Sequence, residues 1–158
     1  MKISDEKDTK RALEWITNIL KKYEVPFQIS GGCAAKIYGS PRELNDIDID
    51  IPENYFSKII SDVKPYIIYG PDQYKDNKWG LYLMTLNYAG QEIDIGSGNA
   101  KISTKDRDKW IDFSTDFSKA VKKTFLGLEV PVIPKEDLVN YKQLLDGEHQ
   151  QVDIESIK

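Results

Sequence analysis

Three aspartates alternate with isoleucines in the segment Asp46-Ile47-Asp48-Ile49-Asp50. Successive side chains of a β-strand point to opposite faces, so a strand here places every carboxylate on one face and the isoleucines on the other. Three like charges on one face repel one another unless a cation or solvent offsets them. The segment therefore predicts a strand that buries its isoleucines and offers its carboxylates to a polyvalent cation.

A double glycine precedes this acidic segment by fourteen residues, in the run Ser30-Gly31-Gly32-Cys33-Ala34-Ala35. Paired glycines alone usually mark only a turn, so their weight comes from their position. A glycine turn that opens a helix of small residues lets backbone amides approach a phosphate without obstruction. A phosphate-binding turn followed by an acidic strand indicates nucleotide chemistry.

A second alternation of acid and isoleucine occurs at Gln91-Glu92-Ile93-Asp94-Ile95. As a strand it places Glu92 and Asp94 on one face. Taken alone, the first alternation is equally typical of a half-buried strand with a polar outer face, and the second is more typical of a solvent-exposed face than of a site. Because the second alternation follows a hairpin turn expected at 87–90 and repeats the pattern of the first, its acids are candidates to share a site with the aspartates.

Size and composition favour one globular α+β domain over residues 1–158, with a core at about 24–133 and a helical segment at about 134–157. The net charge of −4 and the pI near 5.1 argue against a general polyanion binder. No apolar run approaches a membrane span and no secretory signal is recognisable, so we expect a cytoplasmic protein. The single cysteine, Cys33, excludes an internal disulfide, and we expect it to be a packing residue.

Hydrophobic periodicity and the positions of proline and glycine predict the remaining elements. Helices are expected at 4–23, 34–38, from 52–53 to about 63, from 134 onward and at 151–157, and strands at 27–30, 46–51, 66–69, 79–86, 91–95 and twice within 120–133, with a polar stretch at 105–116.

These motifs resemble the opening of the polymerase-β-type nucleotidyltransferase superfamily, in which a Gly-Gly or Gly-Ser turn is followed by an acid-x-acid strand and a third acid on a later strand. The spacing from Arg42 to Asp48 is similar to that of small stand-alone members, the lincosamide and aminoglycoside 2''-nucleotidyltransferases. The resemblance is close over 27–51, holds by pattern at 91–96, is loose over 128–157, and is absent over 66–90. It implies a polymerase-β-like fold, a mixed β-sheet flanked by helices with a helical C-terminal extension.

The resemblance also implies site residues. Such enzymes hold two divalent cations about 3.5–4 Å apart, and Mg²⁺, with Mn²⁺ as an alternative, suits carboxylates completed by phosphate oxygens. The pair Asp48/Asp50 also satisfies the acid-x-acid rule, but the four-residue step from Arg42 favours Asp46/Asp48. The implied catalytic and metal-binding residues are Asp46, Asp48 and Asp94, with Asp94 also a candidate proton acceptor, and the implied triphosphate ligands are Ser30, Gly31, Gly32, Arg42 and Lys142.

The predicted function is metal-dependent transfer of a nucleoside monophosphate from an NTP to a hydroxyl of a small molecule. Two alternatives stay open: modification of RNA or protein, as in toxin–antitoxin systems, and nucleotide binding without turnover. The acidic chain speaks against a nucleic acid partner. The residues do not identify the acceptor or the base of the NTP. They also do not show whether the protein forms a homodimer.

Overall fold

The computed structural model describes residues 7–76, 79–103, 109–145 and 148–157. The predicted start of the first helix at Ser4 and part of the predicted polar stretch fall outside these residues. The elements occur in this order: α1 (Thr9–Lys22), β1 (Gln28–Ser30), α2 (Gly31–Ile37), β2 (Asp46–Ile51), η1 (Glu53–Tyr55), α3 (Phe56–Val63), η2 (Lys64–Tyr66), β3 (Ile67–Lys75), β4 (Trp79–Tyr88), β5 (Gln91–Ser97), β6 (Asn99–Ser103), β7 (Trp110–Ser114), η3 (Phe117–Lys119), β8 (Val121–Phe125), β9 (Leu128–Val132), α4 (Lys135–Lys142) and α5 (Glu148–Ile157).

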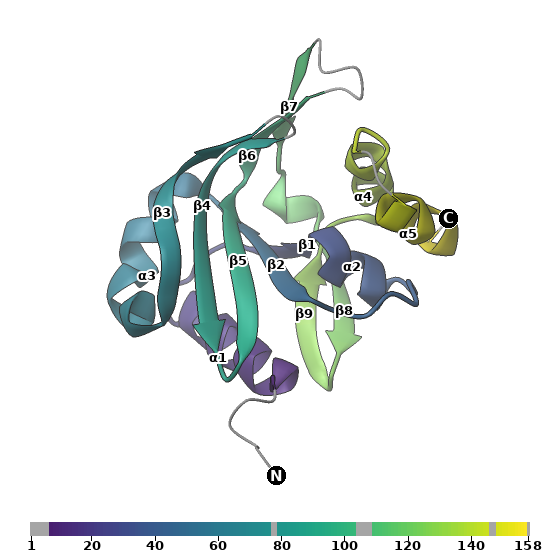
Figure 1. The fold of residues 1–158 in the computed structure, drawn as a ribbon. Coiled ribbons are helices and arrows are strands. Elements are labelled where there is room, and N and C mark those ends of the chain that lie inside the picture. Colours follow the sequence, from purple (N-terminus) through teal and green to yellow (C-terminus); the bar gives the residue numbers. More distant parts are fainter. Residues whose placement is uncertain (1–6, 77–78, 104–108, 146–147, 158) are drawn as a thin grey trace.

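Within the described ranges, nine strands form one mixed sheet in the order β7-β6-β4-β5-β2-β1-β9-β8, and β3 pairs with β4 (Figure 1). The two acidic strands, β2 and β5, are parallel neighbours in its middle, whereas β2 and β1 are antiparallel. A mixed sheet flanked by helices confirms the predicted α+β class. The central position means that both acidic strands are hydrogen-bonded on each side, which makes them rigid supports for side chains.

The pairing of β2 with β5 sets the two acidic segments in register. Asp46 lies opposite Glu92, and Asp48 opposite Asp94. Opposed residues of adjacent strands project from the same face. All of these carboxylates therefore share one face of the sheet, and the isoleucines between them share the other, as the alternation predicted.

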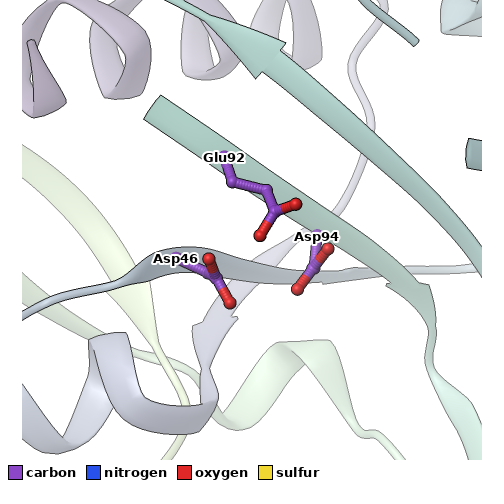
Figure 2. A group of neighbouring side chains, drawn as sticks. All are labelled: Asp46, Glu92 and Asp94. Atoms are coloured by element: carbon purple, nitrogen blue, oxygen red, sulfur yellow. The ribbon is translucent and has the colours of Figure 1, made fainter. Parts of the chain in front are cut away.

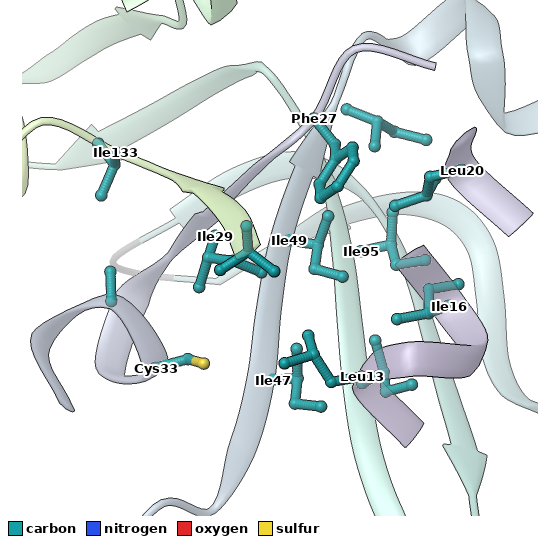
Figure 3. Close-up of a cluster of buried hydrophobic side chains, with 14 of the residues drawn as sticks. Leu13, Ile16, Leu20, Phe27, Ile29, Cys33, Ile47, Ile49, Ile95 and Ile133 are labelled. Atoms are coloured by element: carbon teal, nitrogen blue, oxygen red, sulfur yellow. The ribbon is translucent and has the colours of Figure 1, made fainter. Parts of the chain in front are cut away.

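Two helices cover the isoleucine face. Figure 3 shows the isoleucines of β2 and β5 packed against apolar side chains of α1, and α3 adds Phe56, Ile59 and Val63 to the same core. Each such side chain, when fully buried, contributes about 1.5–3 kcal/mol. The fully buried members from α1, β2 and β5 are Leu13, Ile16, Leu20, Ile47, Ile49, Ile51, Ile93 and Ile95. This core holds the acidic face in place from behind.

The C-terminal helices lie on the other side of the molecule from α3, next to α2 (Figure 1). α4 begins directly after Pro134, as predicted, and α5 begins at Glu148, three residues earlier than expected. None of the helices in the described ranges is long and apolar enough to cross a membrane. α2, α4 and α5 therefore form a wall beside the acidic face of the sheet.

The hairpin of β6 and β7 differs from the prediction, which placed a polar stretch over 105–116. β7 pairs with β6 in antiparallel register, with Ile111 opposite Ile102. Ile102 is buried, and this cross-strand contact favours strand pairing. The signal was missed because charged residues dominate the segment that precedes Trp110. β3 is also longer than expected, since it continues past Gly70-Pro71 through two register shifts.

Candidate active site

Three carboxylates converge on the acidic face of the sheet. Asp46 of β2 and Glu92 and Asp94 of β5 each have an oxygen within 4.8 Å of the others. Figure 2 shows the three side chains turned toward one another from adjacent strands. A set of carboxylate oxygens alone suits hard cations such as Mg²⁺, which keep their other positions for water and phosphate oxygens. The donor set therefore fits a divalent metal ion.

The pKa values show how closely these acids crowd one another. The pKa of Glu92 is raised to about 7, first by its hydrogen bond with Asp46, then by burial and by the charges of Asp46 and Asp94. Burial raises the pKa of Asp94 as well, opposed by a hydrogen bond from Thr85 Oγ1 to Asp94 Oδ1 at 2.8 Å. Carboxylates this close share protons when no cation offsets their charge. When a metal ion binds, these carboxylates would lose the shared protons.

Asp48 lies against the glycine turn, beside the three-carboxylate cluster rather than within it. Burial raises its pKa to about 8, with further contributions from the charges of Asp94 and Asp46, while a hydrogen bond with the Cys33 backbone lowers it. A Cβ at Gly31 would overlap the Asp48 carboxylate, and Gly31 has a φ of +58°. Both observations require glycine at this position.

The glycine turn starts α2 directly, since Gly31 and Gly32 are its first residues. The Gly31 N–H donates to the Tyr141 hydroxyl at 2.6 Å, which ties the turn to α4. Ser30 Oγ donates to Asp50 at 3.1 Å, so this side chain faces Asp50. Of the predicted phosphate-binding residues, Gly31 lies beside Asp48 and Gly32 beside Arg42, and the Ser30 hydroxyl is directed toward Asp50.

Arg42 and Lys142, the two predicted cationic ligands, meet at one buried carboxylate. Arg42 donates to Asp153 from Nε at 2.9 Å and from Nη2 at 2.6 Å, and Lys142 Nζ lies 3.0 Å from the same group. Burial raises the pKa of Asp153, but hydrogen bonds from Arg42, Ser40 and Lys142 outweigh it and lower that pKa to about 2. The structure thus brings both cations together, although 100 residues separate them in sequence.

Two cavities adjoin the acidic face. A polar cavity of about 390 Å³ has the glycine turn, Arg42 and Lys142 in its wall. A larger cavity of about 670 Å³ extends over β4, β5 and β6 and is lined by aromatic, aliphatic and acidic side chains. Four residues line both cavities: Gly31, Asp48, Trp79 and Tyr141. The carboxylates therefore lie where the two cavities adjoin.

Asp50, the alternative partner of Asp48, has a different environment. It accepts hydrogen bonds from Gln28 Nε2 at 3.0 Å and from Ser30. Burial raises its pKa to about 6 despite those bonds. Asp50 lines the larger cavity and is not a member of the three-carboxylate cluster. Cys33 is fully buried, as expected for a packing residue.

Sequence reasoning assigned no site role to Glu92, Tyr141 or Asp153. The signal for Glu92 was present, because the alternation in β5 already placed it beside Asp94. Tyr141 contacts Gly31, and Asp153 contacts Arg42, across more than 100 residues, so no local pattern reveals these two contacts. Such contacts become visible only once α4 and α5 are docked.

No protein-family model matches the sequence, and no curated protein matches it either. Solved structures do match. TM1012 of Thermotoga maritima, a candidate nucleotidyltransferase, superposes with a TM-score of 0.67 at 22% identity, covering 84% of this chain and 81% of that one. The lincosamide antibiotic adenylyltransferase LnuA, solved with lincomycin, gives 0.63 at 16% identity over 96% and 98% of the two chains. ANT(2'')-Ia, solved with adenylyl-2''-tobramycin, gives 0.57 at 14% over 96% and 91%.

These similarities define the architecture. The chain has the fold of the polymerase-β-type nucleotidyltransferases, as the motifs predicted. The first and third of the predicted carboxylates, Asp46 and Asp94, lie together on its central strands, and Asp48 lies between them and the glycine turn.

Proposed function

We propose that the protein is a metal-dependent nucleotidyltransferase that moves a nucleoside monophosphate from an NTP to a hydroxyl group of a small molecule. The observation that carries this proposal is the convergence of Asp46, Glu92 and Asp94, of which Asp46 lines the polar cavity and Asp94 the larger one. A fold shared with nucleotidyltransferases makes the same chemistry the first candidate. A protein that only binds nucleotide would not require Asp94 as a third carboxylate.

The carboxylates have different roles in the proposed transfer. The acceptor oxygen attacks the α-phosphorus of the NTP, the bond from that phosphorus to the β-phosphate oxygen breaks, and pyrophosphate leaves. Asp94, which borders the larger cavity, accepts the proton of the acceptor hydroxyl. Asp46, Glu92 and Asp94, which form the cluster, would hold Mg²⁺ or Mn²⁺, and we assign Asp48, beside them, as a further ligand. When bound, these ions supply positive charge that offsets the charge developing on the phosphate oxygens.

The polar cavity is our proposed site for the triphosphate. Its wall contains Gly31, Gly32, Arg42 and Lys142, which combine the backbone N–H of Gly32 with two cationic side chains, while the Gly31 N–H donates to Tyr141. We assign the acceptor and the nucleoside to the larger cavity, whose wall includes Tyr69, Tyr74 and Trp79. Base stacking on one of these rings is compatible with their position.

A small-molecule acceptor is favoured over RNA by the charge of the larger cavity. Its charged lining residues are Asp48, Asp50, Asp94, Asp116, Asp137 and Lys119. A predominantly acidic wall repels a phosphate backbone. The structurally similar LnuA and ANT(2'')-Ia were solved with lincomycin and an adenylylated tobramycin, respectively. A cytoplasmic location and a homodimer stay predictions.

Incubation with α-³²P-labelled NTPs and Mg²⁺ or Mn²⁺ tests the proposal, with a panel of aminoglycosides, lincosamides, tRNA and protein as acceptors. We expect a labelled small molecule and release of pyrophosphate. Asp94→Asn should abolish transfer, and Asp112→Asn, which changes an exposed carboxylate on β7, should not. Label on tRNA or protein would favour the alternative acceptors, and nucleotide binding without any labelled product would refute turnover on this panel.

A further inference from the structure

We infer that Asp153 is a positioning residue for the nucleotide: it holds Arg42 and Lys142 together in the wall of the polar cavity. This inference rests on the proposed function, since it assigns the triphosphate to that cavity. Asp153 itself lines neither cavity and is completely buried, so it would act through the two cations and not by contact with the ligand.

The hydrogen bonds of Asp153 leave neither oxygen without a donor. Oδ1 accepts from Ser40 Oγ at 2.6 Å and from Arg42 Nε, and Oδ2 accepts from Arg42 Nη2. Lys142 Nζ completes the group at 3.0 Å from Oδ2. A two-pronged contact with Asp153 fixes the plane of the guanidinium and uses two of its five N–H donors, so three are left for other acceptors.

The charges in this group do not cancel. One carboxylate faces two cations, so the cluster keeps a net positive charge next to the cavity. Lys142 is 3% exposed and Arg42 is partly exposed, and both line that cavity. Without the carboxylate, two like charges would be held close together in a largely buried place, and they would move apart. A net positive, rigidly oriented pair is suited to the β- and γ-phosphates of an NTP.

The position of the cluster relative to the glycine turn supports the same role. A Cβ at Gly32 would lie 3.2 Å from Arg42 Nη2, so the guanidinium lies over the second glycine of the turn. Attachment of α5 alone would not require the cluster, because Ile154 and Ile157 already bury apolar side chains there. Buried ion pairs are poor stabilisers in comparison with apolar packing. Placement of the cations is therefore the better explanation of Asp153.

The experiment compares Asp153→Asn with Ile154→Ala in steady-state transfer assays, after thermal unfolding has established how stable each variant is. Asp153→Asn keeps the shape of the side chain and removes its charge. Ile154→Ala weakens the packing of α5 and leaves the ion pairs intact. We expect Asp153→Asn to raise KM for the NTP at least tenfold and to change KM for the acceptor less than twofold. Ile154→Ala should lower the unfolding temperature and change both KM values less than twofold.

Ser40→Ala provides a second test that does not depend on the folding of Asp153→Asn. Ser40 is buried and lines neither cavity; its Oγ donates to Asp153 at 2.6 Å and accepts a longer hydrogen bond, 3.4 Å, from the Arg42 backbone N–H. We expect a two- to fivefold higher KM for the NTP. An unchanged KM for the NTP in both Ser40→Ala and a folded Asp153→Asn would overturn the inference, as would an equal rise in Ile154→Ala. If Asp153→Asn does not fold and Ser40→Ala does, the KM of Ser40→Ala for the NTP alone decides whether the inference holds.

Equilibrium binding separates this inference from the proposed function. If the wild-type protein binds NTP in the presence of Mg²⁺ but transfers nothing, the transferase proposal falls, and the Kd of each variant replaces KM in the comparison. If the wild-type protein transfers label and Asp153→Asn behaves like it, the inference falls alone. If the wild-type protein binds no NTP, both are refuted.

Discussion

Replacement of Asp48 by asparagine should stabilise the metal-free protein while it removes activity. Burial and the charges of Asp94 and Asp46 raise the Asp48 pKa from 3.8 to about 8. The folded state therefore binds a proton that the unfolded state has already released at pH 4 to 8, and stability falls as pH rises through that window. Asparagine does not titrate, so the stability of Asp48→Asn should not fall between pH 4 and pH 8 for this reason.

The shift in pKa sets the size of the effect. At about 1.4 kcal/mol per pH unit, the rise from 3.8 to about 8 corresponds to at most about 6 kcal/mol. Asp48 borders both cavities and stays partly exposed, so solvent reduces the effect, and we expect a gain of about 2–3 kcal/mol at pH 8. For a chain of this size that gain raises Tm by about 5–10 °C. At pH 4 the gain should vanish.

Thermal unfolding in EDTA at pH 4, 6 and 8 measures this gain. Asp112→Asn is the matched control, because its side chain is 77% exposed and the same chemical change there should alter stability by less than about 0.5 kcal/mol. Addition of Mg²⁺ with an NTP should stabilise the wild-type protein more than Asp48→Asn. An Asp48→Asn protein that is no more stable than wild type at pH 8, or whose gain does not depend on pH, would refute the electrostatic account of this site.

Three further predictions concern neighbouring groups. Gly31→Ala should cost about 1–3 kcal/mol in urea unfolding and at least a hundredfold in kcat/KM, because its Cβ would overlap Asp48 and its backbone has a φ of +58°; an unimpaired enzyme would contradict the assigned turn. Glu92→Gln should weaken the Mg²⁺-dependent rise in Tm, since the cluster loses one of three carboxylates, and an unchanged Mg²⁺ titration would remove Glu92 from the ligands. Acid should destabilise the wild-type protein by about 2 kcal/mol through Asp153 as pH falls from about 4 to about 2, because its depressed pKa contributes stability only above that window. Asp153→Asn should lack this transition in acid titrations followed by circular dichroism.

The central strands and the carboxylates on them were predictable because their signals are local. Alternation with a period of two residues places Asp46, Asp48 and Asp94 on a face without knowledge of the sheet order, and buried isoleucines confirm that face. Parallel pairing of β2 with β5 was not predictable, since no local pattern encodes which strands become neighbours. The same limit applies to Asp153, whose partners are set by the docking of α5.

The β6–β7 hairpin shows a different limit of sequence reasoning. The many charged residues before Trp110 are typical of a connecting loop, although Ile102 and Ile111 pair across two strands. Short edge strands depend on their partner more than on their own composition. Such strands therefore form only when the neighbouring strand is in place, and the residues of one strand alone indicate them weakly.

The register of β2 and β5 has a consequence for how such a protein can diversify. A slip of one residue between these strands would turn the isoleucines of one strand toward the cavities and its acids into the core, so the carboxylate cluster tolerates no change of alignment. Much of the wall of the larger cavity comes instead from β3, β4 and β6, on one side of that pair. In the proposed transferase, new acceptor preferences can therefore arise by remodelling one side of the sheet, while the spacing of the carboxylates stays unchanged.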